Sequence, residues 1–264
     1  MHTSVNFSYR QFVPYLHLGF LQIVRVIYIL EKFCRFMSTA VILTTLNEIT
    51  GVKKIVPQIN REWAEEIIFV DGGSTDGTIE EAKKMGFKVV MQTQKGDFTG
   101  GHGAALVDGV NATTSDNIIF FGPDGNAEPK KIPELIEKIK EGYDQVLVTR
   151  FGKGSVNLDA GIIDRFGNKM FTFLVNVFFG GHWTDTLNEN RIISRKAFNE
   201  LKFDALGLAS TQQMCIRGLK IGQKICEVIG NEGERIGGTR KMHPLSTGAS
   251  LSWQIIKEFI FWKM

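Results

Sequence analysis

The stretch that decides the fold runs from residue 66 to residue 78 and reads EIIFVDGGSTDGT. Its apolar start is typical of a buried strand, and that strand ends in a carboxylate, Asp71. Two glycines then allow a tight turn, and the next helix can be capped by Ser74, Thr75 or Asp76. A strand-turn-helix connection explains the capping residues but not Asp71. An acidic group at a strand end beside a helix N-terminus suits the hydroxyls or the base edge of a nucleotide.

Outward from this stretch, the chain alternates between short apolar runs and helical runs with apolar residues at three- and four-residue spacing. We expect strands at residues 40–46, 66–71, 88–93, 117–121 and 145–149. We expect helices at about residues 52–63, 78–85, 102–112 and 130–141. Strands that alternate with helices of this length form an α/β fold with a mostly parallel sheet and right-handed crossovers. In such sheets, ligands bind outside the carboxyl ends of the strands.

The composition is typical of one compact globular unit. The chain has 264 residues, of which 43% are hydrophobic and 22% are charged, and this excludes a disordered chain, a collagen-like repeat and a protein with many membrane spans. A net charge of +3 gives no reason to expect a nucleic-acid partner. The cysteines are odd in number and widely spaced, which predicts reduced cytoplasmic thiols rather than a disulfide framework or a zinc site.

A second acidic turn follows the fourth expected strand, where residues 120–129 read FFGPDGNAEP. Asp124 and Asn126 stand two residues apart in this turn, and hard divalent cations bind carboxylate and amide oxygens of this kind. A β-turn without a metal accounts for the same residues equally well. Four polar residues are thereby expected on one rim of the sheet, namely Asn47, Glu48, Asp71 and Asp124.

The order of these motifs resembles the family-2 glycosyltransferases of GT-A fold, and within them the polyprenyl-phosphate branch of dolichol-phosphate mannose synthase type. The resemblance covers residues 39–242. The first strand of that family ends in Pro-x-x-Asn-Glu, and residues 44–48 keep Asn-Glu but have Thr44 in place of the proline. The second motif resembles Val-Asp-Asp-Gly-Ser-Thr-Asp-Gly-Thr, with Gly72 in place of the second Asp. The resemblance implies a nucleotide pocket lined by Asn47, Glu48 and Asp71.

The turn at residues 122–126 is similar to the metal motif of that family, Asp-x-Asp-x-Gln. Gly122 replaces the first carboxylate, Asp124 is the second, and Asn126 takes the Gln position. The resemblance implies a Mg²⁺ or Mn²⁺ ion held by Asp124 and Asn126. With one carboxylate and one amide, such an ion would depend more on the donor diphosphate and on water for its remaining ligands.

A glycine-rich run, GGHGAA at residues 100–105, resembles the Gly-Lys-Gly-x-Ala element of the same family. His102 stands where a lysine is usual, and the resemblance implies that it donates to the diphosphate of the donor. The alternative is a polar residue at the start of a helix that small side chains pack closely. The run is not the Rossmann fingerprint, because it does not follow the first strand.

The second half of the chain carries a set of basic residues at defined spacings. Arg150 ends the fifth expected strand, and Arg165 lies where an apolar helix over residues 170–179 opens. Asp185 and Arg191 stand six residues apart, similar to the family's Asp-Pro-Thr-Ser-Gly-Phe-Arg. The run RIGGTRK is close to the family's Arg-x-x-Gly-x-Ser-Lys and has its end residues at Arg235 and Lys241.

The resemblance implies an enzyme that transfers a hexose, with inversion, from a UDP- or GDP-linked sugar to a polyprenyl phosphate such as dolichyl or undecaprenyl phosphate. A lipid phosphate is already anionic near neutral pH, because its second pKa is about 6. It needs neutralisation and alignment more than it needs a base. Asp185 is expected to orient the reacting groups, or to act as the base if the acceptor is a hydroxyl. The cations expected to bind the acceptor are Arg150, Arg165, Arg191, Arg235 and Lys241.

Two alternatives remain open at this point. A family-2 transferase that acts on a hydroxyl of a growing polysaccharide would carry the same donor motifs. The replacements at Gly72 and Gly122 also allow a catalytically silent protein that binds nucleotide sugars.

Residues 1–37 are expected to be an extension of the folded domain. Their apolar run at residues 12–30 is interrupted by His17, Gln22 and Arg25. A central arginine costs about 2.5–3.5 kcal/mol on insertion, so an amphipathic helix at the membrane surface is favoured over a membrane span. The alternative is a misassigned upstream stretch, with the true start of the protein at the end of this extension.

Residues 38–245 are expected to form the GT-A domain, and residues 246–264 an amphipathic C-terminal helix. This helix has an apolar run at residues 251–262 with Trp253 and Trp262 near its ends, which suits a membrane interface. Docking on the domain or on a partner subunit is the alternative. These features predict a cytoplasmic enzyme with a peripheral contact on the cytosolic face of the membrane.

Overall fold

The structure is a computed structural model that describes residues 37–237 and 242–263. Ser38–Met264 form a compact unit of the chain. The helix expected at residues 12–30 and the predicted site residue Lys241 lie outside the described residues.

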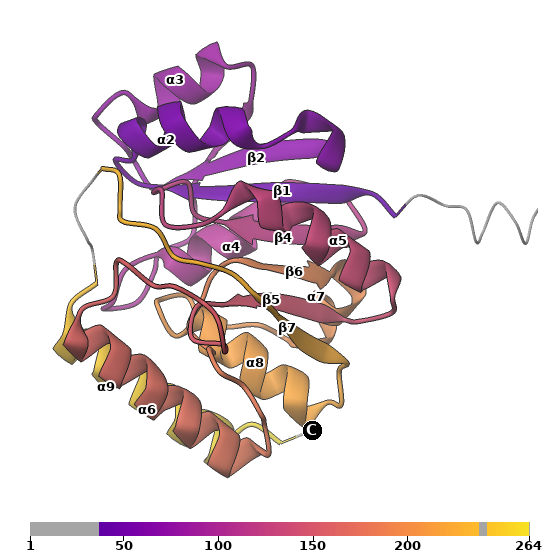
Figure 1. Cartoon of the computed structure of the whole chain (residues 1–264), viewed down its shortest axis with the longest axis vertical. Helices are drawn as coiled ribbons and strands as arrows, with labels where there is room; N and C mark the ends of the chain where they lie inside the picture. Colours follow the sequence, from indigo (N-terminus) through magenta and orange to yellow (C-terminus); the bar gives the residue numbers. More distant parts are fainter. Residues whose placement is uncertain (1–36, 238–241, 264) are drawn as a thin grey trace, which may run out of the picture. The chain divides into compact units, whose positions relative to one another are not determined.

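A seven-stranded sheet runs through this compact unit in the order β3-β2-β1-β4-β6-β5-β7 (Figure 1). β6 runs antiparallel to β4 and β5, and the other strand pairs are parallel. The strands are β1 (Thr39–Thr45), β2 (Glu66–Asp71), β3 (Lys88–Met91), β4 (Asn117–Phe121), β5 (Gln145–Thr149), β6 (Arg191–Ser194) and β7 (Ile225–Ile229). The expected α/β fold with a mostly parallel sheet is confirmed. β6 and β7 were not among the predicted strands.

The helices follow the expected alternation, with two differences at their boundaries. The helix predicted at residues 52–63 is shorter, because Pro57 has no amide hydrogen to donate and 3-10 turns replace the α-helix from Val56 onward. The helix predicted at residues 170–179 begins at Ile162 instead. The helices are α2 (Ile49–Ile55), α3 (Thr78–Lys84), α4 (His102–Asn111), α5 (Ile132–Lys140), α6 (Ile162–Phe179), α7 (Arg195–Glu200), α8 (Ser210–Lys220) and α9 (Pro244–Ile260).

Alternate residues of each strand point to opposite faces of the sheet, and each face is buried under its own set of helices. α2, α3 and α5 pack on one face, where Val41 and Phe69 lie at the centre of the apolar cluster. α4, α7 and α8 pack on the other face, around Ile42 and Phe120. Burial on both faces explains why the central strands read as continuous apolar runs.

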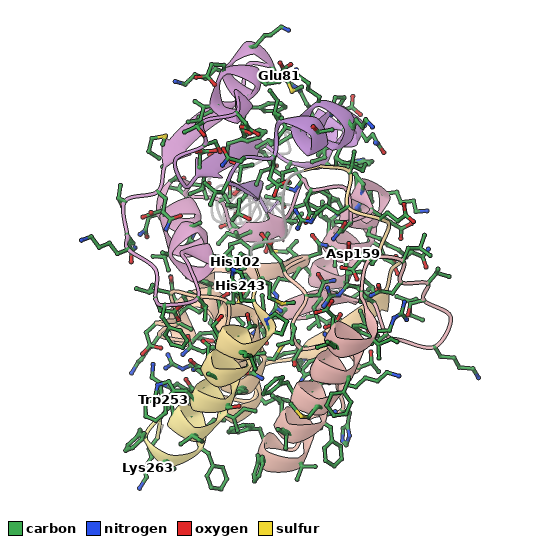
Figure 2. The ribbon with its side chains drawn as sticks, turned by 90° about the vertical axis from the view of Figure 1, so that its left-hand side faces the viewer. Glu81, His102, Asp159, His243, Trp253 and Lys263 are labelled. Atoms are coloured by element: carbon green, nitrogen blue, oxygen red, sulfur yellow. The ribbon has the colours of Figure 1, made fainter. Side chains whose placement is uncertain are left out.

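α6 and α9 lie side by side below the sheet and pack on α8 (Figures 1 and 2). Phe171, Val175 and Leu251 are buried in the cluster that joins the three helices. α9 is the amphipathic helix expected at the C-terminus, and it docks on the domain through one side while Trp253 is exposed on the other. In the described part of the chain, none of the helices has both the length and the apolar character that crossing a membrane requires.

Candidate active site

A cleft of about 470 Å³ opens at the carboxyl ends of β1 and β4, where ligands bind in α/β sheets. Its volume lies in the range of about 300–1,000 Å³ that is usual for small-molecule sites. Because β6 is antiparallel, the residues ahead of it reach the same rim as the residues after the parallel strands. The charged residues that line the cleft are Glu48, His102, Asp124, Arg150, Asp159, Glu189, Glu232 and Arg235.

Asp71 shapes the loop beside the cleft and is not among the residues that line it. Its side chain is buried, and its two oxygens accept hydrogen bonds from the Thr45 hydroxyl, the Gly73 amide, and the amide and hydroxyl of Ser74 at 2.6–2.9 Å. A carboxylate has about four acceptor positions, so these bonds saturate it. In this structure Asp71 supports the turn, and its contact with a nucleotide stays a prediction.

Asn47 also holds loops together, whereas Glu48 faces the cleft. Asn47 has a positive φ of 55°, and its side-chain oxygen accepts from the Thr75 amide at 2.8 Å. This bond ties the loop after β1 to the loop after β2. Glu48 is buried at the end of the cleft, and its Oε1 lies 3.0 Å from Nη1 of Arg235.

Arg235 bridges the two acidic motifs that the sequence singled out. Its Nη2 lies 2.7 Å from Oδ2 of Asp124, while its Nη1 pairs with Glu48. Burial raises the pKa of Asp124 to about 6, and the Arg235 guanidinium opposes this rise. The segments around Asp124 and Arg235 thus meet in the cleft, although 111 residues separate them in the chain.

The turn after β4 fits a divalent cation through its side-chain oxygens. Oδ1 of Asp124 accepts from the backbone amide of Asn126 at 3.1 Å, and the side-chain amide of Asn126 donates to Asp159 at 3.2 Å. Oδ1 of Asn126 is buried and has no hydrogen-bond partner among the residues that the structure describes. Within the same residues, no three His, Cys, Asp or Glu side chains are arranged to hold an ion by themselves. An ion at this turn would therefore need further oxygen atoms from a bound diphosphate or from water.

His102 lines the cleft, but both of its ring nitrogens are engaged. Nδ1 lies 2.8 Å from the Ser210 hydroxyl, and Nε2 lies 3.0 Å from Oε2 of Glu189. The expected donation from His102 to a diphosphate would therefore require one of these contacts to break. The small residues behind it have the packing role that the alternative assigned, since a side chain at Gly103 would collide with the Ala205 carbonyl.

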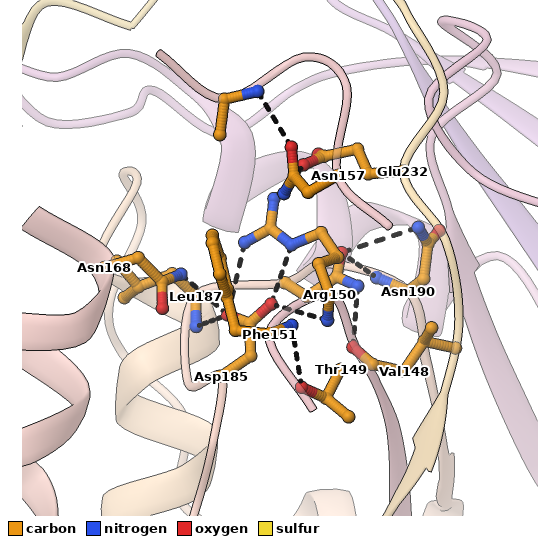
Figure 3. Close-up of polar contacts among 12 residues, drawn as sticks. Val148, Thr149, Arg150, Phe151, Asn157, Asn168, Asp185, Leu187, Asn190 and Glu232 are labelled. Atoms are coloured by element: carbon orange, nitrogen blue, oxygen red, sulfur yellow. Dashed lines mark hydrogen bonds and ion pairs between the residues drawn. The ribbon is translucent and has the colours of Figure 1, made fainter. Parts of the chain in front are cut away.

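Arg150 is fixed at the other end of the cleft by two carboxylates (Figure 3). Its Nε lies 2.7 Å from Oδ2 of Asp185, and its Nη1 lies 2.9 Å from Oε1 of Glu232. Asp185 is fully buried and also accepts from Asn168 at 2.8 Å. Burial alone would raise the pKa of Asp185, but Arg150 and the other donors hold it below its usual value. Asp185 therefore positions Arg150 and does not face the cleft.

A comparison with known protein families identifies the family of the chain that carries this cleft. The model of the family described as glycosyl transferase family 2 matches residues 40–202 of the chain. The chain belongs to glycosyl transferase family 2. It is an enzyme of the class that the order of the motifs implied, and the resemblance drawn from the sequence is confirmed.

Two relatives of this transferase carry names that refer to dolichol. Over 225 residues it is 29% identical to the dolichyl-phosphate hexose transferase of Haloferax volcanii, an alignment that covers 84% of this chain and 94% of the relative. Over 121 residues it is 29% identical to the dolichol-phosphate mannosyltransferase of Pyrococcus furiosus, which covers 45% of this chain and 34% of the relative.

Among solved structures, the transferase is similar to glucosyl-3-phosphoglycerate synthase from Mycobacterium tuberculosis. A crystal structure of that protein with Mn²⁺, UDP and phosphoglyceric acid has a TM-score of 0.65 and 23% identity, and the match covers 86% of this chain and 78% of that chain. Another, with Mg²⁺ and UDP, has a TM-score of 0.67 and 21% identity over 87% and 82% of the two chains. The likeness shows the fold, and the expected GT-A architecture is confirmed.

Arg165 and Arg191, two further cations of the predicted set that the structure describes, do not line the cleft. Arg165 donates through its Nε to the Ala160 carbonyl at 2.9 Å and through its Nη2 to the Asn157 carbonyl, so it caps the loop before α6. Arg191 is fully buried, and its Nη2 donates to the Asn188 carbonyl at 2.7 Å. In this structure both arginines support the chain around the cleft, and their contact with the acceptor stays a prediction.

Two residues of the cleft were missed by the sequence analysis. Glu232 contacts Arg150, and Glu189 contacts His102. Glu232 stands in no recognisable motif, so the sequence offered no signal for it. Glu189 did carry a signal, because it lies inside the Asp-Thr-Leu-Asn-Glu-Asn-Arg segment at a position where the family has glycine.

Proposed function

We propose that the protein transfers a hexose from a nucleotide-diphosphate sugar to a polyprenyl phosphate, with inversion at the anomeric carbon. The name of the Haloferax volcanii relative, which aligns over 94% of its length, supports this acceptor. The observation that carries the proposal is an apolar side pocket that continues from the cleft towards the C-terminal helix.

The apolar side pocket lies where α6 and α9 approach each other below Arg150. Arg150, Leu187, Glu232 and Met242 line both the side pocket and the cleft, so the two spaces join at the guanidinium. The apolar lining of the side pocket includes Phe171 and Leu251. A charged end and an apolar body are what a lipid phosphate requires, with its phosphate at Arg150 and its tail between the helices.

The outer sides of α6 and α9 favour contact with a membrane surface. Large apolar side chains are exposed there beside a few charged residues such as Lys169, and such apolar faces mark sites of contact. Exposed residues of this kind are Ile162, Ile163, Phe166, Phe173 and Val177 on α6, and Leu245, Trp253, Ile256, Phe259 and Ile260 on α9. A peripheral contact through this face would bring the side pocket to the lipid and is part of the proposal.

Different residues of the cleft would act on the leaving group and on the acceptor. Asp124 and Asn126 would hold Mg²⁺ or Mn²⁺, which, when bound, stabilises the charge that grows on the departing diphosphate. At the other end, Arg150 orients the lipid phosphate, which is the nucleophile and needs little help from a base. We expect the phosphate to take the place of Glu232 at Nη1 of Arg150, while Asp185 keeps the guanidinium in place.

A lipid phosphate fits the site better than a polysaccharide hydroxyl does. A hydroxyl acceptor needs a general base in reach of its proton. Asp185, the base expected for that reaction, is fully buried and paired with Arg150. The burial of Asp185 therefore favours an acceptor that is already anionic.

The test is transfer to defined acceptors, read by mass spectrometry. Purified protein is incubated with UDP- and GDP-linked hexoses, Mg²⁺ or Mn²⁺, and dolichyl or undecaprenyl phosphate in liposomes. The expected product is a lipid-linked hexose with inverted configuration. Transfer to phosphoglyceric acid or to an oligosaccharide, with none to the lipid phosphates, would refute the proposed acceptor. Absence of donor consumption in every mixture would favour the silent nucleotide-sugar-binding protein.

A further inference from the structure

Four departures from the family's motifs meet at one point in the cleft. Thr44 replaces a proline, His102 a lysine and Gly122 the first carboxylate of the metal motif, while Glu189 stands in place of a glycine. These residues come from four separate segments, yet the side chains of Thr44 and His102 both contact the carboxylate of Glu189. The four replacements therefore form one local arrangement.

The contact between Thr44 and Glu189 crosses the end of β4. Thr44 belongs to β1, Glu189 precedes β6, and β4 lies between these two strands. The Thr44 hydroxyl donates to Oε1 of Glu189 at 2.6 Å. The crossing is open because Gly122 has no side chain. A Cβ atom there would stand 3.4 Å from Oε2 of Glu189 and 3.8 Å from Oδ1 of Asp124, so an aspartate would meet both carboxylates.

Glu189 is held in a fixed orientation with a free side towards the cleft. Oε2 contacts Nε2 of His102, whose other ring nitrogen contacts Ser210 at the start of α8. These partners occupy two of about four acceptor positions on the carboxylate. The Glu189 side chain is 21% exposed and lines the cleft. It can therefore accept further hydrogen bonds from a ligand.

The order of the strands places Glu189 between the two ends of the reaction. Along the rim, Glu48 follows β1, Asp124 follows β4, Glu189 precedes β6 and Arg150 follows β5, and these strands are neighbours in that order. The hexose must lie between the diphosphate that it leaves and the phosphate that it joins. With the diphosphate at Asp124 and the acceptor at Arg150, the hexose would lie at Glu189.

We propose that Glu189 determines recognition of the hexose by accepting hydrogen bonds from the sugar hydroxyls in the space that Gly122 leaves open. This inference rests on the proposed function, because it assumes a nucleotide-sugar donor. Glu189 would bind the sugar and not the nucleotide. It should therefore contribute to the affinity for a nucleotide sugar but not to the affinity for the nucleotide alone.

The experiment compares the binding of nucleotide sugars and nucleotides by calorimetry in the presence of Mn²⁺. The probes are UDP-glucose, UDP-galactose and GDP-mannose, each against UDP or GDP, with wild-type protein and Glu189→Gln. Losing a hydrogen bond to a charged group weakens binding by about tenfold or more. We expect this loss for the nucleotide sugar, and a change below about twofold for the matching nucleotide.

Two further variants separate sugar binding from a structural effect. Glu200→Gln, on the exposed end of α7, is the matched control and should bind all probes like the wild type. Gly122→Asp should weaken binding of the nucleotide sugars, because it sets a second carboxylate against Glu189 in the space that the sugar is proposed to use.

The outcomes distinguish this inference from the proposed function. An equal loss for nucleotide and nucleotide sugar in Glu189→Gln would place the effect on the diphosphate or its cation and overturn the inference. Unchanged binding of both would also overturn it, while the proposed function would stand. If the wild type bound none of the nucleotide sugars, the proposed function would fail and the inference with it.

Discussion

Two arginines line the same cleft, and the structure holds them in different ways. Arg150 is fixed by Asp185, which is fully buried, and by Glu232. Arg235 pairs with Glu48 and with Asp124, and the side chains of Arg235 and Asp124 are 24% and 21% exposed. The first guanidinium has a permanent partner in the core, whereas the second lies on the carboxylate that a cation would need. Arg150 is thus a fixed element. Arg235, which the sequence analysis expects at the acceptor, pairs instead with the acidic residues of the other motifs, and we propose that a cation bound at Asp124 would displace it.

The largest effect should come from removing the permanent partner. Asp185→Asn leaves the Arg150 charge without its buried carboxylate, and breaking a buried ion pair costs about 3–5 kcal/mol. We expect a fall of that size in the free energy of unfolding, measured by urea denaturation. Asp124→Asn is the matched control at the other end and should cost less than about 1 kcal/mol, because that pair is partly exposed. Equal losses in the two variants would remove the distinction between the arginines.

The next effect concerns the end of the cleft that carries the metal motif. Asp124→Ala should reduce sugar transfer by about 10²–10³-fold, because charge stabilisation at the leaving group contributes about 2.7–4 kcal/mol. Metal-assisted donor binding should be lost in the same variant, while its circular dichroism spectrum and melting temperature stay close to those of the wild type. Unchanged turnover would exclude the role of Asp124 in binding the cation.

A smaller and more specific effect separates the substrates of the two ends. Arg150→Lys keeps the charge but loses the planar fork, so the KM for the lipid phosphate should rise about tenfold while the KM for the donor stays within about twofold. Arg235→Lys should have the opposite pattern: it should change the KM for the donor and the Mg²⁺ requirement, while the KM for the lipid phosphate stays nearly constant. Steady-state kinetics with each substrate varied in turn measures both. If the KM for the lipid phosphate rose in Arg235→Lys but not in Arg150→Lys, then Arg235 and not Arg150 would be the residue that binds the acceptor.

The smallest effect is the response of stability to acid. Burial raises the pKa of Asp185, but Arg150 and the hydrogen bonds more than offset this and hold it below 3.8. Below that pH the unfolded chain binds a proton that the folded chain does not, so stability falls as the pH decreases. The slope for one such group is at most about 1.4 kcal/mol per pH unit. Asp185→Asn should flatten the acid limb of the stability profile, and an unchanged limb would contradict the lowered pKa of Asp185.

The sheet and its ligand-binding rim could be predicted from the sequence, because they follow from local patterns. The parallel strands are continuous apolar runs, and the glycine turns after β2 and β4 mark where those strands end. β6 could not be predicted in this way, since its four residues are too few to show a period. Its antiparallel direction depends on contacts with β4 and β5 that are far away in the sequence.

Side-chain direction explains why some predicted site residues lie elsewhere. The six-residue spacing between Asp185 and Arg191 is visible in the sequence, but spacing alone does not give the direction in which each side chain points. In β6, Arg191 lies opposite Phe120 and Leu147, and its side chain is buried in the core. Fully buried arginines are rare, so a sequence gives little reason to expect one. The partner of Asp185 is Arg150, 35 residues earlier, and that pairing arises only in the folded chain.

The reversed direction of β6 has a consequence for how such an enzyme can change. The segment that delivers Glu189 enters a strand, whereas the other rim segments lead out of strands into crossover helices. Exchanging a residue there leaves the loops after β1 and β2 and their helices in place. If Glu189 has the proposed role, sugar preference can change through a single replacement at position 189, whereas a side chain at position 122 would also meet Asp124.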